Sequence, residues 1–424
     1  MEARWMLARA GGGGPVLVFF SILLGSADWP ATALQGQRSK KMRDTERSPV
    51  SQLSDDLLVE IISRVPYKST RCCKCVSARW RDLVSHPDHR KKLSLSTLAG
   101  IFYQTFRGER FPAMLCGYQS VSGNWCTSMD CSLSFLPKCK RVNMYLLDSC
   151  NGLLLCLCWN QPSDVNGFGY VVCNPVTEKW VALPATTSSS KVRTARLGFD
   201  PSVNSHFHVF EFVSTIGVVD VNMQGHAGKK KLGVYSSKTG VWTHGVVWDN
   251  PLSVSRFPRS IFFNRMLHFS SDNNLVVAID VEGNHRVIRG PMPDSARGVP
   301  NVYLSRGQLH LANGSVSELS IWALEDFSSE NWTLKHSVSH LQLLGTEYSM
   351  FAGNYRVISI HPEHNVIFIV CEQLYMLSGP SLTKLMSYEM DSRELRFICD
   401  LEWGCRTPYL PYVPLLSEPL ADGQ

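Results

Sequence analysis

The densest group of potentially chemical side chains in this chain is a run of cysteines and histidines between residues 72 and 89. Cys72, Cys73 and Cys75 are followed by His86 and His89, and thiolates and imidazoles are common ligands of zinc. Structural zinc sites usually hold two ligand pairs on tight turns, whereas these cysteines follow the spacing of a helix. The pattern therefore favours a helix that buries Cys73 as a small apolar residue over a metal site.

Two further histidine pairs have spacings that would suit metal binding or proton transfer. His206 and His208 lie two apart in an apolar, strand-like run, so both imidazoles would lie on one face. His361 and His364 flank a Pro-Glu pair that is typical of a turn. The sequence has no Gly-x-Ser-x-Gly nucleophile motif, and its only glycine run lacks the lysine of a phosphate-binding loop. We therefore predict structural roles for both pairs, no catalytic residue, no metal site and no cofactor.

The cysteine run belongs to a short helical module. Apolar residues recur at helical spacing in two sets between Leu53 and Lys92, namely Leu57, Leu58, Ile61, Ile62 and Val65, then Cys73, Val76, Trp80, Leu83 and Val84. Ser54 can cap the first helix, and the helix dipole favours the two aspartates in its first turn. Pro66 should end this helix. A module of about forty residues cannot bury so much apolar surface alone. Its surplus apolar face should meet a partner.

This module resembles the F-box, the adaptor-binding module of SCF-type cullin ubiquitin ligases. The resemblance rests on Leu53, Asp55–Leu58, Glu60–Ile62, Arg64–Pro66, Lys68–Ser69, Lys74–Ser77, Trp80–Leu83 and His86–Pro87. Ser54 stands where the family usually has proline, and Arg71 with Cys72 replaces an apolar residue followed by a basic one. The resemblance implies a Skp-family adaptor and, through it, a cullin as partners. The predicted adaptor-binding residues, some of which must instead hold the module together, are Leu53, Leu57, Leu58, Ile61, Ile62, Val65, Pro66, Val76, Trp80 and Leu83.

From about Leu98 onward, short β-rich runs alternate with turn clusters. Five runs share an apolar strand, a polar turn and a second strand, with tryptophan in the clearest copies: Tyr170–Pro184, Leu232–Gly245, Val276–Pro293, Leu319–Val338 and Leu385–Leu401. A second motif places a turn before a strand, at Gly198–Pro201, Arg265–His268, Gly307–His310 and Ile358–Pro362. Self-similarity of this kind, with four strands per unit, predicts a β-propeller whose tryptophans pack between blades.

The same region resembles the F-box-associated domain of plant F-box proteins, a relative of Kelch propellers. The resemblance is specific at Asp148–Leu154, at Cys173–Thr177 with Trp180, and at Ile321–Asp326 with Trp332. The predicted fold is therefore multidomain and mainly β, a small all-α F-box followed by a β-propeller-like domain of six or seven blades. We expect a leader at 1–47, the F-box at 48–95, the propeller at 96–416 and a tail at 417–424.

Charge and the N-terminal residues bear on location and partners. Residues 1–95 hold 16 Lys and Arg against 9 Asp and Glu, which indicates a solvated tail and a basic helix face rather than nucleic-acid binding. Arg4 and Arg9 precede the apolar run Val16–Leu24, a pattern similar to a signal peptide but too short to span a bilayer. Because a secreted F-box would never meet its adaptor, we expect a disordered leader, with Met42 as an alternative start, and a cytoplasmic or nuclear protein without stable membrane insertion.

The predicted function is the non-catalytic substrate-recognition subunit of an SCF-type ubiquitin ligase. An unidentified target protein would bind the propeller through loops such as Ser188–Arg196, Gln224–Lys231 and Asp249–Arg259. One alternative is a non-degradative scaffold or a lectin-like module, in which Trp248 and Trp403 would stack on a sugar. Another is a secreted propeller, which would carry a glycan at Asn313 or Asn331.

Overall fold

The computed structural model describes residues 53–63, 73, 76–86, 89, 98–107, 113–121, 129–137, 144–159, 168–186, 192–214, 230–248, 259–271, 274–291, 300–315, 317–327, 330–344, 354–373, 382–402, 404–415 and 420. The chain divides into two units at the boundary between Leu95 and Ser96. The first unit is helical in its described part, and the second is built almost wholly of strands. The predicted leader at 1–47 lies outside the described residues.

Two short helices, α3 (Asp55–Ser63) and α5 (Ala78–Ser85), pack against each other in the first unit. Ser54 caps α3 as predicted, because its side chain accepts a hydrogen bond from the Leu57 N–H at 3.4 Å. Ser77 caps α5 in the same way through the Trp80 N–H, at 3.2 Å. The predicted end of the helix at Pro66 lies outside the described residues. No helix in the described part of the chain is long and apolar enough to cross a membrane.

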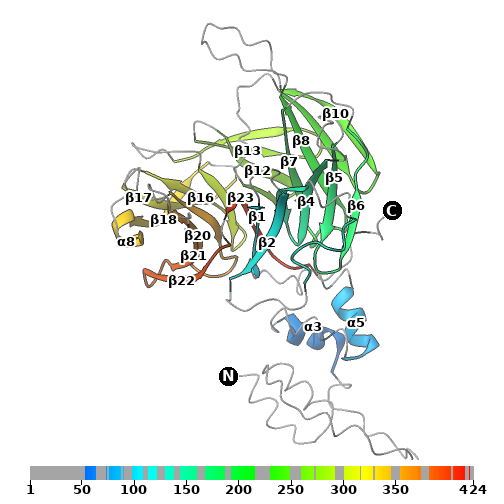
Figure 1. Cartoon of the computed structure of the whole chain (residues 1–424), viewed down its shortest axis with the longest axis horizontal. Helices are drawn as coiled ribbons and strands as arrows, with labels where there is room; N and C mark the ends of the chain where they lie inside the picture. The colour runs from blue at the N-terminus through cyan, green and yellow to red at the C-terminus, as the bar shows by residue number, and fades with distance from the viewer. Residues whose placement is uncertain are drawn as a thin grey trace, which may run out of the picture. The chain divides into compact units, whose positions relative to one another are not determined.

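The second unit contains five sheets of four antiparallel strands, which follow one another along the chain (Figure 1). Blade 1 comprises β3 (Met144–Cys150), β4 (Leu153–Trp159), β5 (Phe168–Asn174) and β6 (Lys179–Ala182). Blade 2 comprises β7 (Val192–Phe199), β8 (Phe207–Ser214), β9 (Lys230–Ser236) and β10 (Val241–Trp248). Blade 3 comprises β11 (Ser260–Phe263), β12 (Met266–Ser271), β13 (Leu275–Ile279) and β14 (His285–Arg289).

Blade 4 comprises β15 (Asn301–Ser305), β16 (Gln308–Gly314), β17 (Glu318–Leu324) and β18 (Trp332–Ser339). The short helix α8 (His340–Leu344) leads to blade 5, which comprises β19 (Asn354–Ile360), β20 (Val366–Gln373), β21 (Leu382–Glu389) and β22 (Glu394–Asp400). A closing blade joins the two ends of the unit in the order β2 (Ala113–Ser120), β1 (Gly100–Arg107) and β23 (Cys405–Tyr412).

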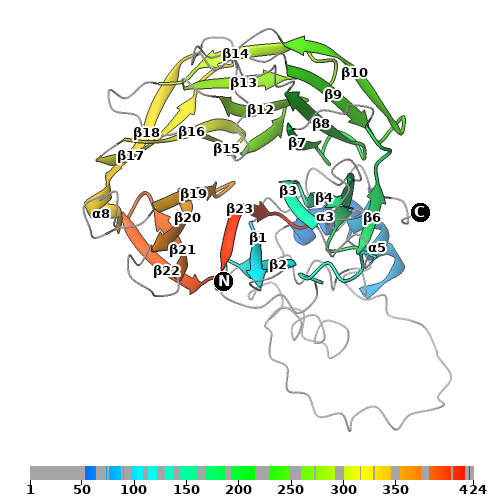
Figure 2. The same cartoon turned by 45° about the horizontal axis from the view of Figure 1, so that its top comes forward.

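The first strands of successive blades contact one another in a ring, β3, β7, β11, β15 and β19, and β23 completes the ring between β19 and β3 (Figure 2). The unit is therefore a six-bladed β-propeller, within the predicted range of six or seven blades. Its closure depends on β23 pairing with β1 in a register that places Tyr412 opposite Gly100. This pairing joins the last strand of the chain to the first strand of the propeller.

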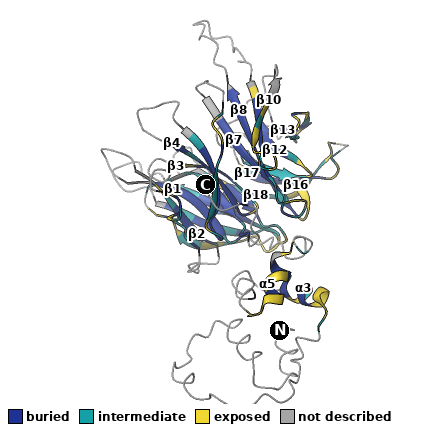
Figure 3. Ribbon diagram, turned by 90° about the vertical axis from the view of Figure 1, so that its right-hand side faces the viewer, coloured by how far each residue is buried: buried dark blue, intermediate teal, exposed yellow. Residues whose placement is uncertain are grey.

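The hydrophobic core consists of layers between neighbouring blades. One layer joins Leu153 and Tyr170 of blade 1 to Phe207 of blade 2, and another joins Ile321 of blade 4 to Ile367 of blade 5. In Figure 3 buried residues run along strands such as β7 and β8, whereas exposed residues are frequent on α3 and α5. Both faces of each sheet therefore pack on other sheets, which is the arrangement that a propeller requires.

The connections between strands differ in length on the two faces of the propeller. The first and second strands of three blades are joined by two-residue turns with positive φ, for example 45° and 88° at Asn151 and Gly152. Since strand direction alternates within a blade, the connections between second and third strands, and between blades, emerge on the opposite face. We call this opposite side the loop face, because the longer connections β8–β9 and β10–β11 lie on it.

Candidate functional site

Helix α3 carries two apolar stripes. Leu58 and Ile62 are 1% and 0% exposed, whereas Leu57 and Ile61 are 53% and 38% exposed. Residues four apart lie on the same face of a helix, so Leu57 and Ile61 form one continuous apolar surface one turn long. This surface, the α3 stripe, is chemically suited to bind an apolar face of another protein.

The other predicted adaptor-binding residues divide between surface and interior. Val76 is exposed just before α5, and Leu53 is half-buried. Trp80 and Leu83 are buried with Leu58 and Ile62, and hold the two helices together. Val65 and Pro66 lie outside the described residues. Direct contact with an adaptor stays a prediction for the whole set, and only the exposed members can make it without rearrangement of the module.

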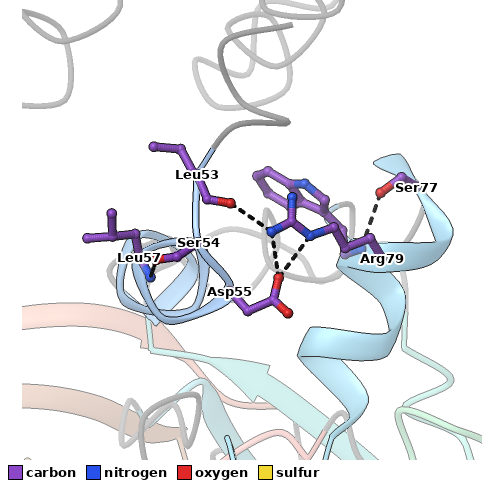
Figure 4. Close-up of polar contacts among 7 residues, drawn as sticks. Leu53, Ser54, Asp55, Leu57, Ser77 and Arg79 are labelled. Carbon is purple, nitrogen blue, oxygen red and sulfur yellow. Dashed lines mark hydrogen bonds and ion pairs between the residues drawn. The ribbon is translucent and has the colours of Figure 1, made fainter. Parts of the chain in front are cut away.

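An ion pair that the sequence did not predict fixes the two helices. The Arg79 Nε donates to Asp55 Oδ1 at 2.8 Å, and its Nη2 donates to the Leu53 carbonyl at 2.7 Å. Both side chains are largely exposed, so the pair contributes at most about 1 kcal/mol. Figure 4 shows Leu57 pointing away from this contact, so the Arg79–Asp55 ion pair does not cover Leu57.

The helix predicted at the cysteine run is present at Cys73, whereas the prediction against a zinc site stays a prediction. Cys73 is helical and buried, and Cys72 and Cys75 lie outside the described residues. The rings of His86 and His89 stand 5.3 Å apart between centroids. Among the described residues, no group of three or more His, Cys, Asp or Glu side chains is placed to hold a metal ion.

The three loops predicted to bind a target all connect strands on the loop face. They join β6 to β7, β8 to β9 and β10 to β11. Their predicted bounds were partly wrong, because Val192–Arg196 belongs to β7 and Lys230 and Lys231 belong to β9. Arg196 is buried and is not a loop residue. Trp248 ends β10, and Trp403 lies outside the described residues.

The inner strands of blades 1 to 3 meet at a buried carboxylate. Asp148 of β3 accepts hydrogen bonds from the Leu197 N–H of β7 and from the Ser260 Oγ of β11, each at 2.9 Å. It also accepts the Ser149 N–H at 2.9 Å. Burial raises the pKa of Asp148, although the nearby Arg196 guanidinium opposes this shift. One side chain thus joins three blades at the centre of the ring.

A second charged side chain reaches across the same ring. Arg259, directly before β11, donates from Nη1 to the Ile358 carbonyl of β19, and its guanidinium carbon lies 5.4 Å from the ring centroid of Tyr303 on β15. The Tyr303 hydroxyl donates to the Val357 carbonyl at 2.6 Å. Burial lowers the pKa of Arg259 and of Arg196. Polar and charged side chains therefore lie at the axis of the propeller, and two of them, Arg196 and Arg259, end loops that the sequence proposed for target binding.

The turn predicted at His361 and His364 is present, whereas the prediction that His206 and His208 share one strand was wrong. His361 lies in a turn, where its Nδ1 accepts the N–H groups of Glu363 and His364 at 3.1 Å each. His208 lies in β8, and burial, then the neighbouring charge of His206, lowers its pKa. His206 precedes the strand and does not belong to it.

Two of the repeated tryptophans pack between blades, as predicted. Trp242 of blade 2 donates its indole N–H to the Pro184 carbonyl beyond blade 1 at 2.9 Å. Trp332 of blade 4 donates to the Arg289 carbonyl of blade 3 at 2.8 Å. Both contacts link the outer strand of one blade to the preceding blade.

Comparisons with known proteins identify both units. A model of the F-box domain matches residues 50–92, and the model described as "F-box protein At3g26010-like, beta-propeller" matches residues 122–396. The chain belongs to this family of F-box β-propeller proteins. Among Arabidopsis thaliana relatives, F-box protein At5g07610 is 28% identical over 67% of this chain and 70% of its own length, and F-box protein At5g49610 is 26% identical over 73% and 86%.

The family-specific motifs of this F-box protein build the propeller. Asn151 donates its side-chain amide to the Phe199 carbonyl at 2.7 Å and so joins the first turn of blade 1 to blade 2. Asn174 donates to the Leu415 carbonyl at 3.0 Å and so holds the segment after β23. Both motif residues therefore join segments of the propeller that are far apart in the sequence.

Proposed function

We propose that this protein is the substrate-recognition subunit of an SCF-type ubiquitin ligase. The observation that carries the proposal is the exposed α3 stripe, Leu57 and Ile61, on a module whose own core is already filled by Leu58 and Ile62. Apolar side chains that stay exposed beside a complete core suit contact with a partner. The Skp-family adaptor is the partner that the F-box family implies.

In this role the chain is not a catalyst. The F-box would connect it to the adaptor and cullin, and the propeller would hold a target protein near the conjugating enzyme, which raises the effective concentration of the two reactants. We propose the loop face as the target-binding side, because connections of variable length commonly carry recognition on a rigid scaffold. A cytoplasmic or nuclear location follows from the adaptor.

The test is a pull-down of the full chain with a purified Skp-family adaptor, using wild type and Leu57→Asp/Ile61→Asp. Leu57 and Ile61 start about half-exposed, so burying each of them contributes about 1 kcal/mol to the free energy of adaptor binding. Placing carboxylates in the same contact weakens binding by several kcal/mol more. Affinity should therefore fall at least about a thousandfold.

The matched control is Val241→Asp/Leu334→Asp, which places two carboxylates on equally exposed apolar positions of the propeller. It should bind the adaptor as wild type does. Unchanged adaptor binding by the Leu57→Asp/Ile61→Asp chain would refute the assignment of the α3 stripe. Adaptor binding without ubiquitylation of any captured protein would instead favour the scaffold function.

A further inference from the structure

The propeller axis holds a guanidinium that has no carboxylate partner among the described residues. Arg259 gives one hydrogen bond to the Ile358 carbonyl and lies over the Tyr303 ring. No Asp or Glu of the described chain lies within ion-pair distance of it. A guanidinium carries five N–H donors, so most of its donor capacity is not used by these contacts.

The nearest acidic group is already occupied. The Asp148 carboxylate accepts the Ser149 and Leu197 N–H groups and the Ser260 hydroxyl. It interacts electrostatically with both Arg196 and Arg259, so two guanidinium groups share one buried carboxylate. Burying a charge without a counter-charge is costly, and among the described residues at this part of the axis two guanidinium groups face one carboxylate. The excess favours an anion at the axis.

Arg259 is the least buried of the three charged residues at the axis. Arg259 is partly exposed, whereas Asp148 and Arg196 are almost fully buried. It directly follows the β10–β11 connection, which belongs to the loop face. A ligand approaching from that face would therefore meet Arg259 first.

We propose that Arg259, backed by Tyr303, forms an anion-binding site at the axis of the propeller, which takes an oxyanion carried by the target protein. The oxyanion is a carboxylate or a phosphate, both of which match the planar fork of an arginine side chain. That a target protein carries it depends on the proposed ligase function. The anion site itself does not.

The first test uses the wild-type full chain and phenylglyoxal, which modifies accessible arginines. Modification of each arginine is followed by peptide mass spectrometry with and without inorganic phosphate, at constant ionic strength because salt alone screens charge. At a phosphate concentration of about ten times the Kd, modification of Arg259 should slow about tenfold, because only the unoccupied site reacts. Arg265, exposed in the β11–β12 turn on the opposite face, is the internal control and should react at the same rate in both conditions.

Repeating the experiment with acetate in place of phosphate distinguishes a carboxylate ligand from a phosphate ligand. Protection by both ions indicates a carboxylate ligand, and protection by phosphate alone indicates a phosphorylated one. No protection by either ion, or an Arg259 that does not react at all, would overturn the proposal.

The second test measures phosphate affinity by calorimetry for Arg259→Gln, Arg259→Lys and the control Arg265→Gln. Arg259→Gln should weaken binding at least about tenfold, Arg259→Lys should weaken it less because it retains the charge, and Arg265→Gln should leave it unchanged. Equal affinities in all chains would refute the site. None of these assays contains the adaptor. A failed pull-down would therefore reject the ligase function and leave the anion site untested by that result, and a failed anion assay would reject the anion site without bearing on adaptor binding.

Discussion

The junction between blades 1 and 2 contains a buried carboxylate whose partners allow a sharp test of how the blades are held together. Glu211 of β8 is 0% exposed, and its two oxygens accept the Tyr170 hydroxyl of β5 at 2.9 Å and the Thr186 hydroxyl at 2.8 Å. Tyr170→Phe removes one of these donors and leaves the ring in place. The buried carboxylate then loses a hydrogen bond that no solvent replaces.

A hydrogen bond to a charged group contributes about 1.5–3 kcal/mol to the free energy of unfolding. The propeller unit spans Ser96–Gln424, about 330 residues, and unfolding entropy of about 2.1 cal/mol/K per residue gives about 0.7 kcal/mol/K for the unit. Tyr170→Phe should therefore lower the Tm of the propeller by about 2–4 °C. Differential scanning calorimetry of the full chain would resolve this shift.

Tyr235→Phe is the matched control, because Tyr235 is equally buried at the same junction and its hydroxyl has no hydrogen bond to the described residues. Its Tm should stay within about 1 °C of wild type. In a Glu211→Gln background, Tyr170→Phe should cost only about 1 kcal/mol, since the acceptor is then neutral. Equal shifts for the two tyrosine variants, or an undiminished cost of Tyr170→Phe in the Glu211→Gln background, would refute the interpretation.

Two further predictions concern pH and backbone geometry. Burial lowers the pKa of His268 on β12 from 6.5 to about 4. As pH falls, this histidine is therefore protonated in the unfolded chain before it is protonated in the folded one. About 3 kcal/mol of the free energy of unfolding, present above pH 6.5, is lost by pH 4. Urea unfolding at pH 7 and pH 5 should show a smaller pH dependence in His268→Gln than in wild type, and an equal dependence would exclude this residue as the cause. Gly152→Ala should lower the free energy of unfolding by at least about 2 kcal/mol more than Gly240→Ala in the same assay. A Cβ at Gly152 would lie 2.3 Å from Leu415 Cβ, whereas a Cβ at Gly240 would have nothing within 4 Å. Both glycines have positive φ, so equal costs would show that backbone conformation alone matters.

Local patterns predicted the blades well. Each of the five repeated runs coincides with the third and fourth strands of a four-stranded blade, for example Tyr170–Pro184 with β5 and β6. The second motif coincides with turns between first and second strands, as at Gly307 before β16. Both signals are local, because alternation along a strand and the residues of a tight turn are set by neighbours in sequence.

Long-range features escaped prediction for a physical reason. The pairing of β1 with β23 joins the two ends of the propeller, and no local pattern encodes which strands close a ring. Arg196 looked like part of a basic loop, yet it lies in β7, where its charge is compensated by Asp148 from another blade. In the F-box, Leu57 and Leu58 are equivalent in periodicity. Which of them faces inward depends on where α5 packs, and Arg79 helps to set that position through Asp55.

The residues that identify the family and those that would recognise a target are therefore different sets. Asn151, Asn174 and Trp242 each make a contact between distant segments of the propeller. A target-binding group has no such constraint, since connections on the loop face can vary in length at small cost in closure entropy. Arg259 lies at the boundary between these two sets, because it is partly exposed directly after the β10–β11 connection of the loop face and also donates a hydrogen bond to β19 across the ring. It is the position where a change of target would be expected to alter the chain without opening the propeller.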